Sequence, residues 1–154
     1  MKRSIFEPGV KESVFKRIDA ITTDTKGKWG KLSVVQMIRH LSEANRMAFG
    51  DIPMPDRSNL LTRTLFKWMF LSNIKPPGRE KGKIQTFPEV DVVKRGIAIE
   101  DLESEKARYK ATVERILSTP VLHPTHTVFG KMTREDWGYL VYAHADYHLT
   151  QFNS

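Results

Sequence analysis

The sequence contains, near its C-terminus, the stretch Trp137-Gly-Tyr-Leu-Val-Tyr-Ala-His144-Ala-Asp-Tyr-His148-Leu-Thr-Gln-Phe152. Apolar residues recur in it at steps of three or four, which predicts one helix with a stripe that faces a core. His144 and His148 continue this stripe, and side chains four residues apart lie one turn from each other on the same helix face. One metal ion could therefore bind both imidazoles. The alternative interpretation is a pair of core histidines, each satisfied by a hydrogen bond.

Length and composition set the broad class of protein. The chain has 154 residues, which fits one domain over residues 1–154. It contains no cysteine, so thiol nucleophiles, thiolate metal sites and disulfides are excluded, and a metal would be held by His, Asp or Glu. No apolar run has the length of a signal peptide or a membrane span, and we expect a cytoplasmic protein with no membrane partner.

Positive charge is concentrated between Arg57 and Lys83. This segment carries seven Lys or Arg residues and one acid, Glu80, in a chain whose formal net charge is +7. It is either a solvated connection or a surface that attracts the anionic part of a small molecule. Nucleic acid is disfavoured as a partner, because the part from Lys75 onward has no interleaved aromatic residues and no recognisable reading helix.

Hydrophobic periodicity predicts mainly helices. They are expected at about residues 10–21, 34–49, 59–73, 100–117 and 134–152. Ser33 with Gln36 has the spacing of a capping box, Thr133 with Asp136 resembles another helix start, and Gly50 suits the end of the second helix. No glycine-rich phosphate loop, nucleophile elbow or internal repeat occurs in the sequence.

Two further segments indicate how the helices are arranged. The helix at 59–73 is apolar on more than one face, and a domain of this size cannot enclose it fully, so we expect it to form a homodimer surface. The connection at 74–98 is long and rich in Pro and Gly, which permits a crossover between distant helices. Within it, residues 86–91 are expected to be extended because of Pro88.

Other histidines and acids are candidates for the same chemistry. His40 lies beside the apolar stripe of the second helix, so a helical bundle could present it with the C-terminal pair to one divalent ion. Glu105 interrupts the stripe of the fourth helix, either as a ligand or as an acid that reaches water at the edge of the stripe. His123 and His126 lie in a loop, where a histidine is either catalytic or an incidental surface residue.

The position after the first C-terminal histidine argues against one familiar reaction. Helical zinc peptidases carry Glu directly after the first His as the general base, and this chain has Ala145 there. Proteolysis by that route is therefore disfavoured. The unranked candidates for acid–base chemistry are Glu43, Glu105, His126 and Asp146.

Several short motifs lie on or beside the expected helices. They are Trp29-Gly-Lys-Leu-Ser33, Met37 with His40 and Leu41, Phe129-Gly-Lys-Met-Thr133, Trp137-Gly138, Tyr142, His144, His148-Leu149 and Gln151-Phe152. In these motifs, which span most of the chain, the sequence resembles the DinB-like (DinB/YfiT) family of metal-binding proteins, in particular one of its branches of domains of unknown function. Members of this branch often carry a histidine where this chain has Tyr147.

The resemblance implies a fold and a metal site. The fold is all-α, a four-helix bundle of DinB/YfiT-like topology with a long crossover loop and an additional short helix. The family's three metal ligands carry over to His40, His144 and His148. The cofactor is then a divalent metal ion, zinc or nickel first, with iron or manganese as alternatives.

The resemblance implies less about the reaction. Characterised relatives include zinc-dependent transferases of low-molecular-weight thiols and mycothiol-dependent isomerases. The leading hypothesis is a metal-dependent enzyme of the hydrolase or thiol transferase type, in which the ion activates water or a thiol for a small-molecule substrate that is anionic or itself a thiol. The alternative is a non-catalytic metal-binding or stress-response module.

Overall fold

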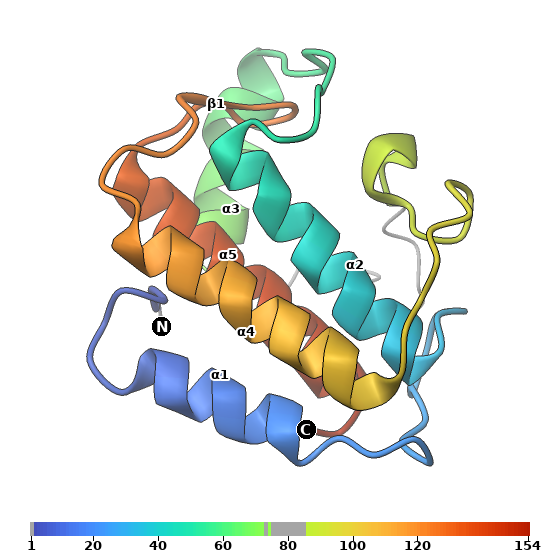
Figure 1. Ribbon diagram of the computed structural model, residues 1–154. Coiled ribbons are helices and arrows are strands. Elements are labelled where there is room, and N and C mark those ends of the chain that lie inside the picture. Colours follow the sequence, from blue (N-terminus) through green and yellow to red (C-terminus); the bar gives the residue numbers. More distant parts are fainter. Residues whose placement is uncertain (1, 73, 75–85) are drawn as a thin grey trace.

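The computed structural model describes residues 2–72, 74 and 86–154 of the chain (Figure 1). These residues are mainly helical. The α-helices are α1 (Val10–Asp19), α2 (Val34–Arg46), the short α3 (Lys67–Leu71), α4 (Leu102–Ser118) and α5 (Arg134–Gln151). Shorter elements are the 3-10 turns η1 (Met47–Phe49) and η4 (Pro88–Val90), the π-helical turn η2 (Thr62–Phe66), and a hairpin of β1 (Thr125–His126) and β2 (Gly130–Lys131). The small sheet means that the fold is not purely α.

The predicted helix ends are confirmed at three places. The Ser33 hydroxyl accepts a hydrogen bond from the backbone N–H of Gln36, and the Gln36 side chain accepts one from the Ser33 backbone. Thr133 and Asp136 form the same reciprocal capping box at the start of α5. Gly50 has a φ of 71°, the left-handed conformation that favours glycine after the end of a helix. No helix in the described ranges is long and apolar enough to cross a membrane.

Helices α2 and α4 run in the same direction. Near their starts Arg39 Nη1 lies 3.1 Å from a carboxylate oxygen of Glu105, and beyond the end of α2 Asp51 lies 2.6 Å from Arg115 near the end of α4. The chain must therefore return towards the start of α2 before α4 begins, and Figure 1 shows the described residues that precede α4, in yellow-green, beside α2. The crossover that the long connection permits is thus required by the helix directions.

Helix α1 packs against α4 and α5. It runs antiparallel to α4, since Lys11 pairs with Glu114 at 3.0 Å and Asp19 pairs with Lys110 at 2.6 Å. Arg17 reaches across to Asp146 on α5, and α5 also packs against α2 and α3. Because α5 has neighbours on several sides, it is buried on more than the one predicted stripe.

The segment before α4 differs from its prediction. The sequence predicts that residues 86–91 are extended, and this is wrong for the middle, where Pro88–Val90 forms a 3-10 turn. Pro88 occupies the first position of the turn, where its fixed φ suits a helical start. Phe87 is extended, as expected for a residue before proline. The turn brings the Val90 carbonyl to α2.

The third predicted helix begins at residue 60 and continues through the π-helical turn into α3. Its apolar exposure is confirmed, with Leu60 81%, Leu61 52% and Trp68 60% exposed. A homodimer formed through this surface stays a prediction. The predicted end of the helix at Asn73 and the part of the basic segment from Lys75 to Lys83 lie outside the described residues.

A buried ion-pair network joins the crossover segment to the helices. Glu105 is fully buried, so the interpretation of it as an acid that reaches water is wrong. Its carboxylate lies 3.1 Å from Arg39 and 3.3 Å from Arg108. Arg39 also pairs with the buried Glu43, and Arg95 of the crossover segment lies 3.2 Å from the same carboxylate. A buried carboxylate needs such partners, because losing them leaves its charge without compensation.

We predict that Glu105→Ala destabilises the protein strongly. The substitution leaves Arg39 mostly buried beside one carboxylate in place of two, and breaking such a buried pair costs about 3 kcal/mol. Glu114→Ala on the same helix is the control, because its ion pair with Lys11 is exposed to solvent and its loss should change the free energy of unfolding far less. Urea denaturation measures both values. Equal effects of the two substitutions would contradict the role of the network.

Candidate metal centre and the neighbouring cavity

Three histidines from two helices come together in the interior. His40 lies in the middle of α2, and His144 and His148 lie on α5. Their ring centroids are 4.9 to 5.0 Å apart, and one ring nitrogen of each lies within 4.8 Å of the others. His40 and His148 are buried and His144 is partly buried. This cluster could hold a metal ion.

A backbone carbonyl orients the first of these rings. His40 Nδ1 lies 3.3 Å from the carbonyl oxygen of Val90. A carbonyl only accepts hydrogen bonds, so Nδ1 carries the proton and the lone pair of a neutral His40 is on Nε2. That Nε2 atom lies 3.1 Å from Nε2 of His144. The η4 turn therefore directs Nε2 of His40 into the cluster.

A glutamine orients the last ring. His148 Nδ1 lies 2.8 Å from Oε1 of Gln151, and the Gln151 amide nitrogen donates a short hydrogen bond to the Trp29 carbonyl. The carbonyl can only accept, which fixes the amide so that Oε1 faces His148. Gly30 makes room for this arrangement, because a Cβ at that position would lie 2.5 Å from Gln151 Nε2. The loop before α2 thus supports a side chain near the end of α5.

Burial keeps two of the rings uncharged at neutral pH. It lowers the pKa of His144 well below the usual range, and His148 and His40 add to this effect. It also lowers the pKa of His40, although the Val90 carbonyl acts in the opposite direction. Neutral imidazole is the form that binds metal ions.

The donor set fits a divalent ion. Three imidazoles bound at 2.0–2.1 Å in a tetrahedral site place their nitrogens about 3.3 Å apart. The separation of 3.1 Å between Nε2 of His40 and Nε2 of His144 is close to that value, and one nitrogen of each of the three rings lies within 4.8 Å of the others. Single hydrogen bonds to core histidines account for the Nδ1 atoms of His40 and His148. Between the opposite edges, His40 Nε2 and His144 Nε2 lie within hydrogen-bond distance at 3.1 Å, and a shared ion accounts for the approach of all three rings.

The acidic candidates do not belong to this cluster. Glu43 and Glu105 are held by arginines in the buried network, and Asp146 lies 2.8 Å from Arg17. Each carboxylate is thus committed to a guanidinium group. Ala145 is buried between the two histidines of α5 and supplies no base.

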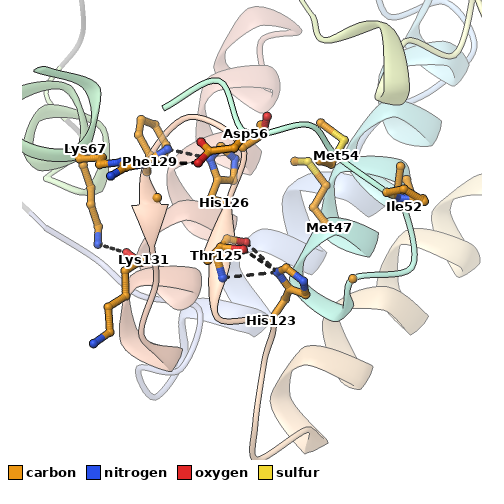
Figure 2. Close-up of a pocket in the computed structure, with 15 residues that line it drawn as sticks. Met47, Ile52, Met54, Asp56, Lys67, His123, Thr125, His126, Phe129 and Lys131 are labelled. Carbon is orange, nitrogen blue, oxygen red and sulfur yellow. Dashed lines mark hydrogen bonds and ion pairs between the residues drawn. The ribbon is translucent and has the colours of Figure 1, made fainter. Parts of the chain in front are cut away.

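A cavity of about 700 Å³ lies beside the hairpin (Figure 2). It is lined by residues of η1, the linker after it, the η2–α3 segment and the hairpin, and both loop histidines are among them. His123 is partly buried there. His126 is only 7% exposed, so the interpretation of it as a surface residue is wrong. The sequence signal for this is Gly130, whose φ of 64° permits the hairpin that folds His126 inward.

Backbone amides hold His126 in one tautomer. Its Nδ1 accepts hydrogen bonds from the backbone N–H groups of Val128 at 3.2 Å and Phe129 at 3.3 Å, so the proton is on Nε2. The ring stacks on Phe129 with centroids 4.7 Å apart and contacts Trp137 edge-on. Burial, together with the charge of Lys67, lowers the pKa of His126 to about 4.

His126 also links the cavity to the histidine cluster. Phe87 contacts His126 edge-on at 6.5 Å between centroids. Three residues later Val90 orients His40. The segment from Phe87 to Val90 therefore borders both sites.

Comparison with known proteins identifies a family. The family model described as "Protein of unknown function (DUF1569)" matches residues 10–154. No curated protein and no solved structure matches the chain. The matched range includes all three clustered histidines and the cavity.

We predict that neutral His126 contributes stability that is lost in acid. The unfolded chain binds a proton near the ordinary pKa of about 6.5, whereas folded His126 stays neutral down to about 4, so stability falls as the pH drops through this window. Between pH 7 and pH 5 the loss from this residue is about 2 kcal/mol. His126→Gln keeps an acceptor for the backbone amides but does not titrate. Urea denaturation of both metal-free proteins should show a steeper pH dependence for the wild type, and parallel curves would contradict the assignment.

Proposed function

The chain belongs to the DUF1569 family of proteins of unknown function, and we propose that it is a metal-dependent enzyme in which His40, His144 and His148 bind one divalent ion. The observation that carries the proposal is the convergence of three imidazoles on one point, with the Nδ1 atoms of His40 and His148 occupied by other partners. Such outer hydrogen bonds are the usual means of orienting histidine ligands.

We further propose that the chain is one DinB-like domain over residues 1–154, a four-helix bundle of α1, α2, α4 and α5. The parallel directions of α2 and α4, with the long crossover between them, support this topology. So do the positions of the histidines, one on α2 and two on α5, which agree with the ligand positions that the DinB-like resemblance implies.

The residues of this chain determine what the centre can do. When bound, a divalent ion at three imidazoles supplies a Lewis acid that activates water or a thiol at a remaining coordination position. The Val90 carbonyl and Gln151 hold His40 and His148 in place, and burial limits the access of water. The proposed ion is zinc or nickel, with iron or manganese as alternatives, although imidazole ligands by themselves suit zinc, nickel, iron and copper alike.

The proposed reaction is hydrolysis or the transfer of a low-molecular-weight thiol to a small substrate. Ala145 in place of a peptidase base argues against proteolysis. The alternative is a non-catalytic metal-binding or stress-response module, for which a metal would mainly stabilise the fold. Removal of the metal by a chelator separates the two, because loss of the helical circular dichroism signal favours the structural role and its retention favours the catalytic one.

We predict that the metal content depends on the cluster and on no other histidine. Untagged wild-type protein should carry about one divalent ion per chain, whereas His40→Ala and His148→Ala should each lose most of it, because two imidazoles bind far more weakly than three. His123→Ala is the control, since His123 lines the cavity and lies outside the cluster. Elemental analysis measures all four proteins. Equal metal in all of them would refute the site.

We also predict that Gly30→Ala weakens metal binding from a distance. A Cβ at Gly30 would displace Gln151, which then no longer fixes His148, and losing such a partner typically costs 10–100-fold in affinity. Gly96→Ala is the matched control, because Gly96 also has a positive φ but a Cβ added there would meet no atom within 4 Å. Competition with a chromophoric chelator measures the affinities. An equal loss in both variants would indicate backbone strain alone.

A further inference from the structure

The cavity beside the hairpin has two chemically different sides. Figure 2 shows Met47, Met54 and Ile52 on one side, and Lys67 and Lys131 on the other. Such a combination of apolar surface with a few polar groups is typical of sites for small molecules. The volume of about 700 Å³ is sufficient for a ligand of moderate size.

The basic side chains that line the cavity differ in whether a carboxylate neutralises them. Arg63 lies 3.2 Å from Asp56 and Lys67 lies 2.8 Å from Asp136, so both are balanced by a carboxylate. Lys131 is an exposed residue at the rim, its ammonium group points away from His126 in Figure 2, and it forms no ion pair with any residue that the structure describes. The cavity therefore favours a ligand with negative charge.

His126 supplies a directional donor in the same cavity. Its Nδ1 is taken by two backbone amides, which leaves Nε2–H as the remaining polar group of a side chain that is 7% exposed. Within residues 2–72, 74 and 86–154, no protein acceptor bonds to this group. This N–H group is therefore available to an acceptor atom of a ligand. Because the ring is held neutral, it can donate but does not compete for the proton of a ligand.

We propose that this cavity binds a small carboxylate with an apolar portion, and that His126 Nε2–H and Lys131 bind its carboxylate oxygens. The apolar portion packs against the methionines and Ile52 on the opposite side. The identification of this ligand as the substrate rests on the proposed metal function and on the segment from Phe87 to Val90, which contacts His126 at one end and His40 at the other. The binding of the carboxylate itself does not require the metal.

The test is a titration of metal-free protein with sodium hexanoate, followed by calorimetry or by amide chemical shifts of the hairpin. Binding with a Kd of about 1 mM or lower is expected for a ligand of this size. Hexan-1-ol and inorganic phosphate should each bind at least about tenfold more weakly, because each lacks one half of the recognised chemistry. Equal binding of hexanol would overturn the anionic part of the proposal, and equal binding of phosphate would overturn the apolar part.

Four variants locate the site. His126→Phe keeps an aromatic ring but removes the donor, and should raise the Kd about tenfold or more, while His126→Gln retains a donor and should recover part of the affinity. Lys131→Gln should raise the Kd about threefold. Lys16→Gln, an exposed lysine on α1 away from the cavity, is the control and should bind as the wild type does.

The outcomes separate this inference from the metal proposal. If His126→Phe does not fold, His126→Gln and Lys131→Gln decide the matter together. No hexanoate binding by the wild type, or unchanged binding in both of these variants, would overturn the inference. The metal content of the Lys131→Gln protein should equal that of the wild type in either case, because Lys131 lies outside the histidine cluster.

Discussion

Bringing three imidazoles together in a protein interior sets the main constraint on this structure. Each ring has two nitrogens, and a buried nitrogen without a partner is costly. Two of the outer nitrogens have hydrogen-bond partners: Nδ1 of His40 contacts the Val90 carbonyl, and Nδ1 of His148 contacts the Gln151 side chain. The inner edges face one another, where Nε2 of His40 and Nε2 of His144 can share a hydrogen bond and the three rings together can share an ion.

The relative direction of helices α2 and α4 explains why the Val90 carbonyl lies beside His40. Because α2 and α4 are parallel, the chain crosses back between them, and the end of that crossover lies on α2 where it delivers Val90. The buried carboxylates Glu43 and Glu105 bind Arg95 and Arg39, which hold the crossover segment to both helices. The ion-pair network is thus connected to the centre through the backbone, although none of its charges touches the histidines.

Much of the histidine cluster could be predicted from the sequence, because local rules determine it. The four-residue spacing of His144 and His148 and the apolar periodicity around His40 place these side chains on inward faces. The capping residues Ser33 and Thr133 likewise determine helix starts through contacts within one turn. Each capping residue pairs with a residue three positions later, so these contacts can be predicted from the sequence alone.

The remaining features depend on contacts between distant segments. Glu105 looks like an edge residue along its helix, and only its approach to Arg39 explains its burial. His126 looks like a loop residue until Phe129 and Trp137 enclose it. Pro88 disfavours helix at the preceding residue, but it is also well suited to the first position of a helical turn. The sequence around it is therefore compatible with an extended segment and with the observed 3-10 turn.

The most direct test of the metal centre is the X-ray absorption spectrum of the untagged, purified protein at the edge of the metal that it carries. The account predicts a coordination shell with three imidazole nitrogens at about 2.0–2.1 Å, if the metal is zinc, and space for at least one further ligand. A coordination shell made only of oxygen atoms, or a protein that carries no divalent metal after growth in supplemented medium, would contradict it.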